Sequence, residues 1–386
     1  MKKTITIILC IAILAAAIVG CGGKTDESAG GDTDDNAVLD ALESIPAEIE
    51  NGANFYGIDF DAAFKTFKPD TIMINAGDYT VTWEELYFYM HGNILNIISN
   101  VGEIPSWSEI LHEDVSFADA VMDFSLENAM MYKAVEYGAK LAGISPGPED
   151  LDQMQKDFEE AAAEYGGEDK FLEMLRETNG IYTRNMFDYL VRTGFLANLY
   201  FRTVYGENGE LLSDEEVAEH TKQDGYLRAK HILRLKPEEG EDTARQEIDD
   251  ILAQLNNYEG DDFGAFFDEL MRENTEDNLA SYPNGYLFQY GDMVPSFYEA
   301  CVALELGNYS GIVESEYGYH ILYRLPIDYD EVPFAYFRQN DYTTLRNIAA
   351  LDMFDSTLYG WLDALNPEFT AEFESIDIAT VFALDN

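Results

Sequence analysis

Cysteine and positive charge are what this sequence has least of. Its 386 residues include 3 cysteines, and 23 lysine and arginine residues stand against 74 aspartate and glutamate residues. The formal net charge of -51 repels a phosphate backbone and therefore argues against nucleic-acid binding. We interpret the acidity as a source of solubility in a salty or crowded exterior. Attraction of basic partners is an alternative that composition alone does not decide.

Histidine is also scarce, with residues at positions 91, 112, 220, 231 and 320. Their separations do not match the spacing of zinc ligands, and the chain has no nucleotide-binding motif, so we expect no metal and no cofactor. Hydrophobic residues nevertheless make up 47% of the sequence, which excludes a globally disordered chain. The length is sufficient for two or three domains with cores of their own.

The N-terminus is predicted to be a targeting segment. Two lysines precede an apolar run from Thr4 to Val19, and Ile18-Val19-Gly20-Cys21 looks like a bacterial lipobox. We expect residues 1–20 to be a lipoprotein signal peptide and Cys21 to carry the lipid. The alternative is an uncleaved anchor helix, because the apolar run could almost span a bilayer. Either arrangement holds the chain to the outer face of the cytoplasmic membrane by its N-terminus.

The cysteines and the segment after the predicted signal peptide agree with an exported lipoprotein. Cys10 would leave with the signal peptide and Cys21 would be acylated, so Cys301 alone remains and no intramolecular disulfide can form in the mature chain. Residues 21–53 are rich in Gly, Asp, Glu and Ser, which is the composition of an acidic flexible tether.

Residues 70–222 are predicted to be mostly helical. Short strands are expected at Thr71–Asn75 and Tyr79–Val81, and Thr82 with Glu85 has the form of a capping box that starts a helix at Trp83. Further helices are expected over 116–141, 148–165, 170–177 and 183–205, and a second capping box is expected at Ser213 and Glu216. A helix over 334–365 and an acidic tail follow near the C-terminus. Such a long helix needs a partner for its apolar face, and we expect it to pack on residues 70–222.

The stretch from Tyr226 to Leu325 organises the chain. It opens with YLRAKHILRL and closes with EYGYHILYRL, two strand-like apolar runs that each contain one histidine. Between them lies the phrase GDMVPSFYEACVALELGNYSGIV. The opening AKHIL, the DF at 262–263, the GDMVPSFYEA at 291–300, the LELGNYS at 304–310 and the YGYHI at 317–321 together resemble a parvulin-type peptidyl-prolyl isomerase domain. The strand–turn–strand–helix segment that begins near residue 71 is similar to the start of the chaperone domain in extracytoplasmic foldases of the PrsA and SurA type.

The resemblance implies a set of site residues. In the family two histidines on adjacent strands share hydrogen bonds with a cysteine or aspartate, which places His231, His320 and Asp277 in the catalytic network. It also implies an apolar floor for a proline ring. The floor residues would be Met293 and Phe297, with Phe288 and Leu287 as walls.

Each assignment has a structural alternative. The histidines could be mutually satisfied core residues, Met293 and Phe297 have the spacing of a core-facing helix stripe, and Asp277 could be a turn residue. The sequence also departs from the family pattern. Residues 283–287 replace the common GGDLG turn, Val294 stands where glutamine is frequent, and Tyr317 stands where a serine or threonine often joins the network. These departures leave the level of activity open.

We therefore expect an α+β fold in which N- and C-terminal segments form a mostly helical chaperone domain, SurA N-terminal-like, interrupted by an inserted parvulin domain with a small antiparallel sheet surrounded by helices. The expected ranges are 54–225 for the first part of the helical domain, 226–326 for the insertion and 327–386 for the C-terminal helix and tail.

The resemblance implies a lipid-anchored peptidyl-prolyl isomerase and foldase that acts on unfolded exported proteins outside the cytoplasmic membrane. The alternative is a non-enzymatic holdase that keeps the parvulin fold as a docking platform, and a second copy of the chain is among the partners considered. A solute-binding lipoprotein is a third class. The helical block lacks the alternating strands and helices of such proteins.

Overall fold

The computed structural model describes residues 54–383 except 56, 103, 238–242 and 340. The predicted signal peptide, Cys21 and the predicted tether lie outside the described residues. The chain divides into two compact units, one formed by residues up to Val204 together with those from Phe354 onward, the other by Tyr205–Met353. We call them the discontinuous unit and the inserted unit. The predicted α+β arrangement, in which both ends of the chain build one domain and the middle forms another, is confirmed.

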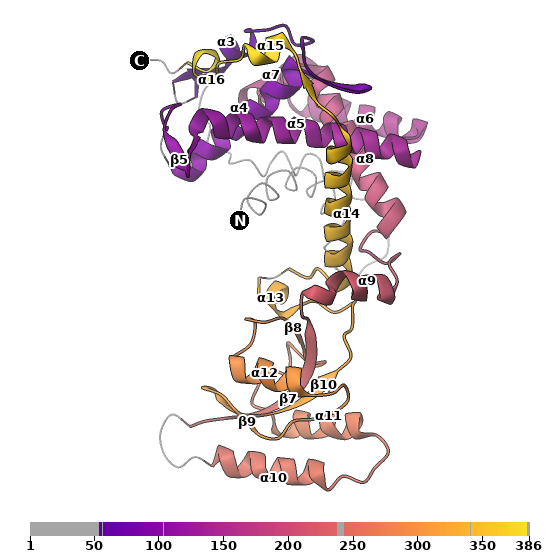
Figure 1. Ribbon diagram of the computed structural model, residues 1–386. Coiled ribbons are helices and arrows are strands. Elements are labelled where there is room, and N and C mark those ends of the chain that lie inside the picture. Colours follow the sequence, from indigo (N-terminus) through magenta and orange to yellow (C-terminus); the bar gives the residue numbers. More distant parts are fainter. Residues whose placement is uncertain (1–53, 56, 103, 238–242, 340, 384–386) are drawn as a thin grey trace. The chain divides into compact units, whose positions relative to one another are not determined.

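The discontinuous unit is mostly helical (Figure 1). Its elements before the insertion are β1 (Asn54–Phe55), β2 (Ile58–Asp59), α3 (Phe60–Phe64), β3 (Ile72–Ala76), β4 (Tyr79–Thr82), α4 (Trp83–Val101), β5 (Ile110–His112), β6 (Val115–Ser116), α5 (Phe117–Ala142), α6 (Pro148–Glu164), α7 (Glu168–Asn179) and α8 (Arg184–Tyr205). After the insertion come α14 (Leu345–Ala364), which begins in the inserted unit, β11 (Glu368–Phe369), α15 (Ala371–Glu374) and α16 (Ile378–Val381).

Helix α4 begins where the capping signal predicts. The Glu85 amide donates to Thr82 Oγ1 at 3.4 Å while the Thr82 amide donates to Glu85 Oε2 at 2.8 Å, which satisfies two of the amides left unpaired at a helix start. The predicted apolar face of this helix is buried: Leu86, Met90 and Ile94 have no exposed surface. Met130 and Met131 on α5 are buried as well, so the methionines in this part of α5 belong to the core.

The C-terminal chain completes the discontinuous unit. Strand β11 pairs antiparallel with β3, so that residues almost three hundred positions apart share one small sheet of order β11-β3-β4. The Phe382 side chain is fully buried, and its carbonyl accepts a hydrogen bond from Trp107 Nε1 at 3.1 Å. Further along, the Trp361 indole of α14 covers Gly138 of α5, where a Cβ would lie 2.2 Å from the ring.

The helix predicted over 334–365 is in fact two helices. A short helix, α13 (Phe334–Phe337), is separated from α14 by a segment that includes Asp341 and Thr343. The Asp341 carboxylate accepts from the Thr343 amide at 2.9 Å and from its hydroxyl at 2.6 Å. This local side-chain hydrogen bonding competes with helix formation, which is why the apolar pattern alone overestimated the helix.

The inserted unit is built around a four-stranded antiparallel sheet of order β8-β7-β10-β9. Its elements are α9 (Asp214–His220), the 3-10 turn η1 (Thr221–Gln223), β7 (Leu227–Leu235), α10 (Ala244–Asn256), α11 (Phe263–Asn274), β8 (Tyr286–Phe288), α12 (Pro295–Ala303), β9 (Val313–Glu314), β10 (Gly318–Leu325) and α13. The capping box predicted before α9 is present, because Ser213 and Glu216 each bond the other's backbone amide.

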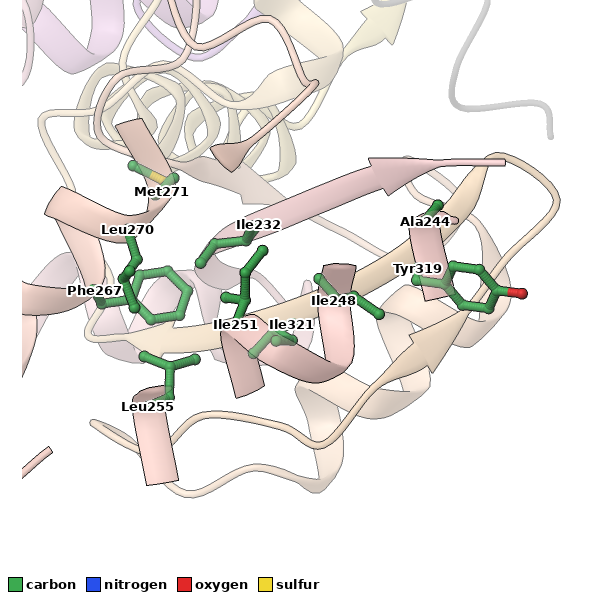
Figure 2. Packing of buried hydrophobic residues seen from close by; sticks show 10 residues of the cluster. All are labelled: Ile232, Ala244, Ile248, Ile251, Leu255, Phe267, Leu270, Met271, Tyr319 and Ile321. Atoms are coloured by element: carbon green, nitrogen blue, oxygen red, sulfur yellow. The ribbon is translucent and has the colours of Figure 1, made fainter. Parts of the chain in front are cut away.

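The two faces of this sheet carry different residues because side chains alternate along a strand. Ile232 of β7 and Ile321 of β10 pack with apolar residues of α10 and α11, including Ile248 and Phe267, in one core cluster (Figure 2). The neighbouring positions, among them His231, therefore lie on the opposite face, where α12 packs.

The part of the chain that the structure describes contains no helix long and apolar enough to cross a bilayer. In the same part, no group of three or more His, Cys, Asp or Glu side chains is placed to hold a metal ion.

Candidate active site

The register of the two central strands brings the predicted histidines together. His231 of β7 is paired with Leu322, and His320 of β10 is paired with Leu233, so the two imidazoles occupy diagonal positions on one face of the sheet. Their Nδ1 atoms are 3.1 Å apart. The ring planes differ by 13° with centroids 5.3 Å apart. Two residues separated by 89 positions in the sequence thus form one hydrogen-bonded pair.

Asp277 joins this pair from the segment between α11 and β8. Its Oδ2 is 2.6 Å from His231 Nε2. The segment is tied to β7 by two hydrogen bonds, because the Glu276 amide donates to the Leu233 carbonyl at 2.9 Å and the Leu233 amide donates to Thr275 Oγ1 at 3.1 Å. This strand-like attachment is what places a residue from an irregular loop within reach of His231.

Two members of the network were not predicted from the sequence. Ser315 Oγ is 2.7 Å from His320 Nε2, and the Tyr286 hydroxyl donates to Asp277 Oδ2. Tyr317, which stands where a serine or threonine often joins the network in the family, instead donates its amide to Ser315 Oγ at 3.2 Å. The sequence signal for this hydroxyl was Ser315, a serine two positions before Tyr317 in the turn that precedes β10. Tyr286 had no comparable signal, since only the fold brings β8 beside Asp277.

The direction of each hydrogen bond follows from Asp277. An ionised carboxylate only accepts, so His231 donates from Nε2 and a neutral His231 has a bare Nδ1. His320 must then donate from its Nδ1, which leaves its Nε2 to accept from the Ser315 hydroxyl. With a neutral His231, the order Ser315–His320–His231–Asp277, with Tyr286 also donating to Asp277, gives each of these polar groups a hydrogen-bond partner.

The pKa values of His320 and Asp277 are both lowered, but for different reasons. Burial is the main reason that the pKa of His320 is lowered to about 4, and His231 lowers it further against the charge of Asp277. For Asp277 burial alone would raise the pKa. The hydrogen bonds that it accepts from His231 and Tyr286 outweigh burial and lower the pKa to about 2. Burial and Asp277 both raise the pKa of Tyr286. At neutral pH Asp277 is therefore ionised, while His320 and the Tyr286 phenol are uncharged.

The predicted floor residues lie at different depths. Phe297 of α12 is buried and sets its ring edge-to-face against both imidazoles, with centroid distances of 5.1 Å to His231 and 5.7 Å to His320. Phe288 is fully buried and packs on Phe297 at 5.5 Å. Met293 is only partly buried against the same cluster.

Leu287 is the predicted site residue that the structure does not bring to this face. Tyr286 and Phe288 both belong to the cluster around α12, and strand alternation directs the residue between them to the other side of the sheet. Cys301, on α12, is buried, and burial raises the pKa of its thiol to about 11, which fits a structural residue.

Residues 231–325, which include both histidines, Asp277 and α12, match the family model of the PPIC-type PPIase, or rotamase, domain. The inserted unit contains a parvulin domain. Its two histidine-bearing strands, β7 and β10, are the central strands of the sheet. The match ends at the last residue of β10, so α13 and the segment around it lie beyond the parvulin domain as the family defines it.

Several curated relatives are similar in sequence to this chain. The chain is 33% identical over 178 residues to the foldase protein PrsA of Halalkalibacterium halodurans, an alignment that covers 44% of this chain and 49% of the relative. It is 36% identical over 117 residues to the foldase protein PrsA of Oceanobacillus iheyensis, covering 28% of this chain and 34% of the relative. The chain thus spans about half, or less, of the length of the curated relatives it matches.

A solved structure of the PrsA peptidylprolyl isomerase from Bacillus anthracis aligns with 62% of this chain and 95% of its own, at 21% identity and with a TM-score of 0.24. The domain match, rather than this superposition, identifies the inserted unit.

Proposed function

We propose that this protein is a peptidyl-prolyl cis/trans isomerase that acts as a foldase on exported proteins. The observation that carries the proposal is the hydrogen-bonded chain from Ser315 through His320 and His231 to Asp277, with Phe297 across both imidazoles, inside a domain of the rotamase family.

The reaction that such a site would catalyse needs neither proton transfer nor a covalent intermediate. A prolyl bond isomerises slowly because its C–N bond has partial double-bond character, with a barrier of about 20 kcal/mol. A catalyst lowers this barrier by favouring the twisted amide, in which conjugation is lost and the charge on the carbonyl changes. Fixed dipoles in a site shielded from water serve that purpose, because they need no reorganisation when the amide twists.

The residues divide this work between them. Asp277 holds His231 in one tautomer and orientation, and Ser315 does the same for His320. Met293 and Phe297 grip the proline ring through apolar contact, which suits a ring that has no donor of its own. Phe288 supports Phe297 from behind.

The direct test is a refolding reaction limited by prolyl isomerisation. We expect the wild-type protein to accelerate it and His231→Ala to lose most of the acceleration. His112→Ala is the control, because this exposed histidine lies on β5 in the discontinuous unit. Absence of acceleration by the wild-type protein, or an equal rate with His231→Ala, would refute the catalytic proposal and leave the holdase as the alternative.

The proposal includes the location. Signal-peptide cleavage before Cys21 and acylation of that cysteine would anchor the chain outside the cytoplasmic membrane, where unfolded exported proteins with Xaa-Pro bonds are its substrates. The support is the lipobox-like Ile18-Val19-Gly20-Cys21 and the similarity to PrsA foldases. Palmitate labelling should be lost in Cys21→Ala, and the protein should then leave the membrane fraction. A homodimer is the remaining part of the proposal, to be tested by sedimentation of the purified protein.

A further inference from the structure

The chain continues to pack on the inserted unit's sheet after the parvulin domain has ended. Glu331 forms an ion pair with Arg228 of β7, and the two side chains are only 20% and 14% exposed. Arg228 also donates to the Asn284 carbonyl in the loop before β8, at 3.5 Å. This contact draws the segment after β10 to the edge of the sheet formed by β8.

Helix α13 then places aromatic rings on that edge. The Phe334 ring lies edge-to-face on Tyr286, with centroids 5.3 Å apart and planes at 82°, and it contacts Tyr282 at 5.5 Å. Phe337 packs on Tyr282 at 5.1 Å, and Tyr282 in turn contacts Tyr286 at 4.3 Å. Phe334 therefore touches Tyr286 directly, whereas Phe337 lies one ring further away.

Tyr286 connects this aromatic layer to the catalytic network. Its hydroxyl donates to Asp277 Oδ2, the same oxygen that accepts from His231 Nε2. The position of the Tyr286 ring thus decides whether Asp277 Oδ2 keeps its second hydrogen-bond donor. A ring that loses the contact with Phe334 can tilt, and its hydroxyl then withdraws from Asp277.

The far end of the same segment is also fixed. Arg346, only 9% exposed, bonds Asp330 at 2.6 Å, Asp214 at 2.7 Å and the Leu212 carbonyl at 2.8 Å. In addition the Leu345 amide donates to the Glu331 carbonyl at 3.0 Å. The contacts of Asp330 and Glu331 before α13 and of Arg346 after it therefore flank the helix and keep it beside Tyr286.

We propose that Phe334 is a positioning residue of the isomerase. Packed on Tyr286, it holds the phenol hydroxyl against Asp277 and through Asp277 sets the orientation of His231. The working isomerase then extends beyond residue 325, the end of the family match, to the Arg346 anchor. The kinetic part of this inference rests on the proposed isomerase activity, whereas the orientation of His231 can be measured without it.

The test compares two aromatic deletions in the full chain, Phe334→Ala and Phe337→Ala. Both side chains are partly buried, so a purely structural role would give similar effects. We expect Phe334→Ala to lower kcat/KM for a short Xaa-Pro peptide about tenfold, through kcat rather than KM, as for the loss of one well-placed hydrogen bond. Phe337→Ala should remain within about twofold of wild type, and Phe334→Tyr, which keeps the ring, should restore activity.

Imidazole ¹⁵N spectra of the same variants give a reading that does not depend on turnover. The signals of His231 should change in Phe334→Ala and in Tyr286→Phe but not in Phe337→Ala. The double variant Phe334→Ala/Tyr286→Phe should be no worse than Tyr286→Phe alone, because both changes remove one interaction.

Equal effects of the two alanine variants, additive effects in the double variant, or an unchanged His231 spectrum in Phe334→Ala would each overturn the positioning role. If the wild-type protein proves to have no isomerase activity, the proposed function fails, and the spectra still decide whether Phe334 orients His231.

Discussion

Ser315 shows how much one small side chain contributes to the site. It is 9% exposed, its hydroxyl donates to His320, and its oxygen accepts from the amides of Tyr317 and Gly318 at 3.2 and 3.3 Å. It thus fixes the turn before β10 and the tautomer of the histidine that follows. Without this hydroxyl, His320 Nε2 would lose the donor that satisfies it in a buried place.

Ser315→Ala should therefore destabilise the inserted unit by about 1–3 kcal/mol, the cost of an unsatisfied buried acceptor. Isomerase activity should fall in parallel, since His320 is no longer held in one tautomer. Urea unfolding and kcat/KM measure the two effects, with Ser315→Thr as the variant that keeps the hydroxyl. A fully stable and active Ser315→Ala would contradict the hydrogen-bond order assigned to the network.

His320 also makes the protein sensitive to acid. Its folded-state pKa of about 4 lies below the unfolded value near 6.5, so the unfolded chain binds more protons between these two pH values. The contribution of His320 to the unfolding free energy should be constant above about pH 6.5 and should fall by about 3 kcal/mol towards pH 4. The groups that face this imidazole are His231, Ser315 and, beyond His231, Asp277, whose own contribution is lost only below pH 3.8.

Urea unfolding followed from pH 7 to pH 4 measures this dependence. The non-titrating His320→Asn should show a shallower fall over that range than the wild-type protein. His91, buried in the discontinuous unit with a pKa also lowered to about 4 by burial, adds a loss in the same direction that both proteins share. Identical slopes for the two proteins would mean that His320 titrates normally in the folded state.

At the scale of elements, helix packing in the discontinuous unit depends on a glycine. A Cβ on Gly138 of α5 would lie 2.2 Å from the Trp361 ring, and the ring is itself 9% exposed and held by Tyr200 at 4.7 Å. Such a contact cannot be accommodated without moving a packed indole. Gly92 of α4 is the opposite case, because its Cβ position has no atom within 4 Å.

Gly138→Ala should accordingly destabilise the protein by about 1–3 kcal/mol through overpacking. Gly92→Ala should stabilise it by about 0.5–1 kcal/mol, because alanine is the better helix former and meets nothing. Thermal or urea unfolding distinguishes the pair. A stabilising Gly138→Ala would show that α14 does not pack on α5 as described.

At the scale of the whole molecule, the last described residues of the chain complete the core of the discontinuous unit, to which the first described residues also belong. Phe382 is fully buried and contacts Tyr87 of α4 at 5.8 Å and Phe60 of α3 at 6.0 Å. The discontinuous unit is therefore complete only after the inserted unit has been synthesised.

Phe382→Ala should cost about 3–5 kcal/mol, the usual penalty for removing a large buried aromatic side chain. Phe369→Ala is a suitable control, because Phe369 is 42% exposed. The unfolding transition of the discontinuous unit should move to lower denaturant in the first variant and change little in the second. Equal transitions would mean that the C-terminal chain is not part of that core.

The sequence predicted most of the local structure because local structure depends on nearby residues. The capping boxes at Thr82 and Ser213 and the strands around His231 and His320 all follow from spacing within a few positions. The single helix expected over 334–365 was wrong, because hydrogen bonds of Asp341 interrupt a pattern that is otherwise helical.

The sequence by itself determined the α+β class, the parvulin motifs, and the two histidines and one aspartate that were expected to meet. The tertiary structure alone decided that Ser315 and Tyr286 complete the network, that Leu287 faces away from it and that Phe334 packs behind Tyr286. The physical reason is the separation along the chain of the residues that interact. Helix caps and strand alternation are set by neighbours in the chain, whereas the partner of a buried polar group depends on which distant strands and loops come to lie within about 3 Å of it.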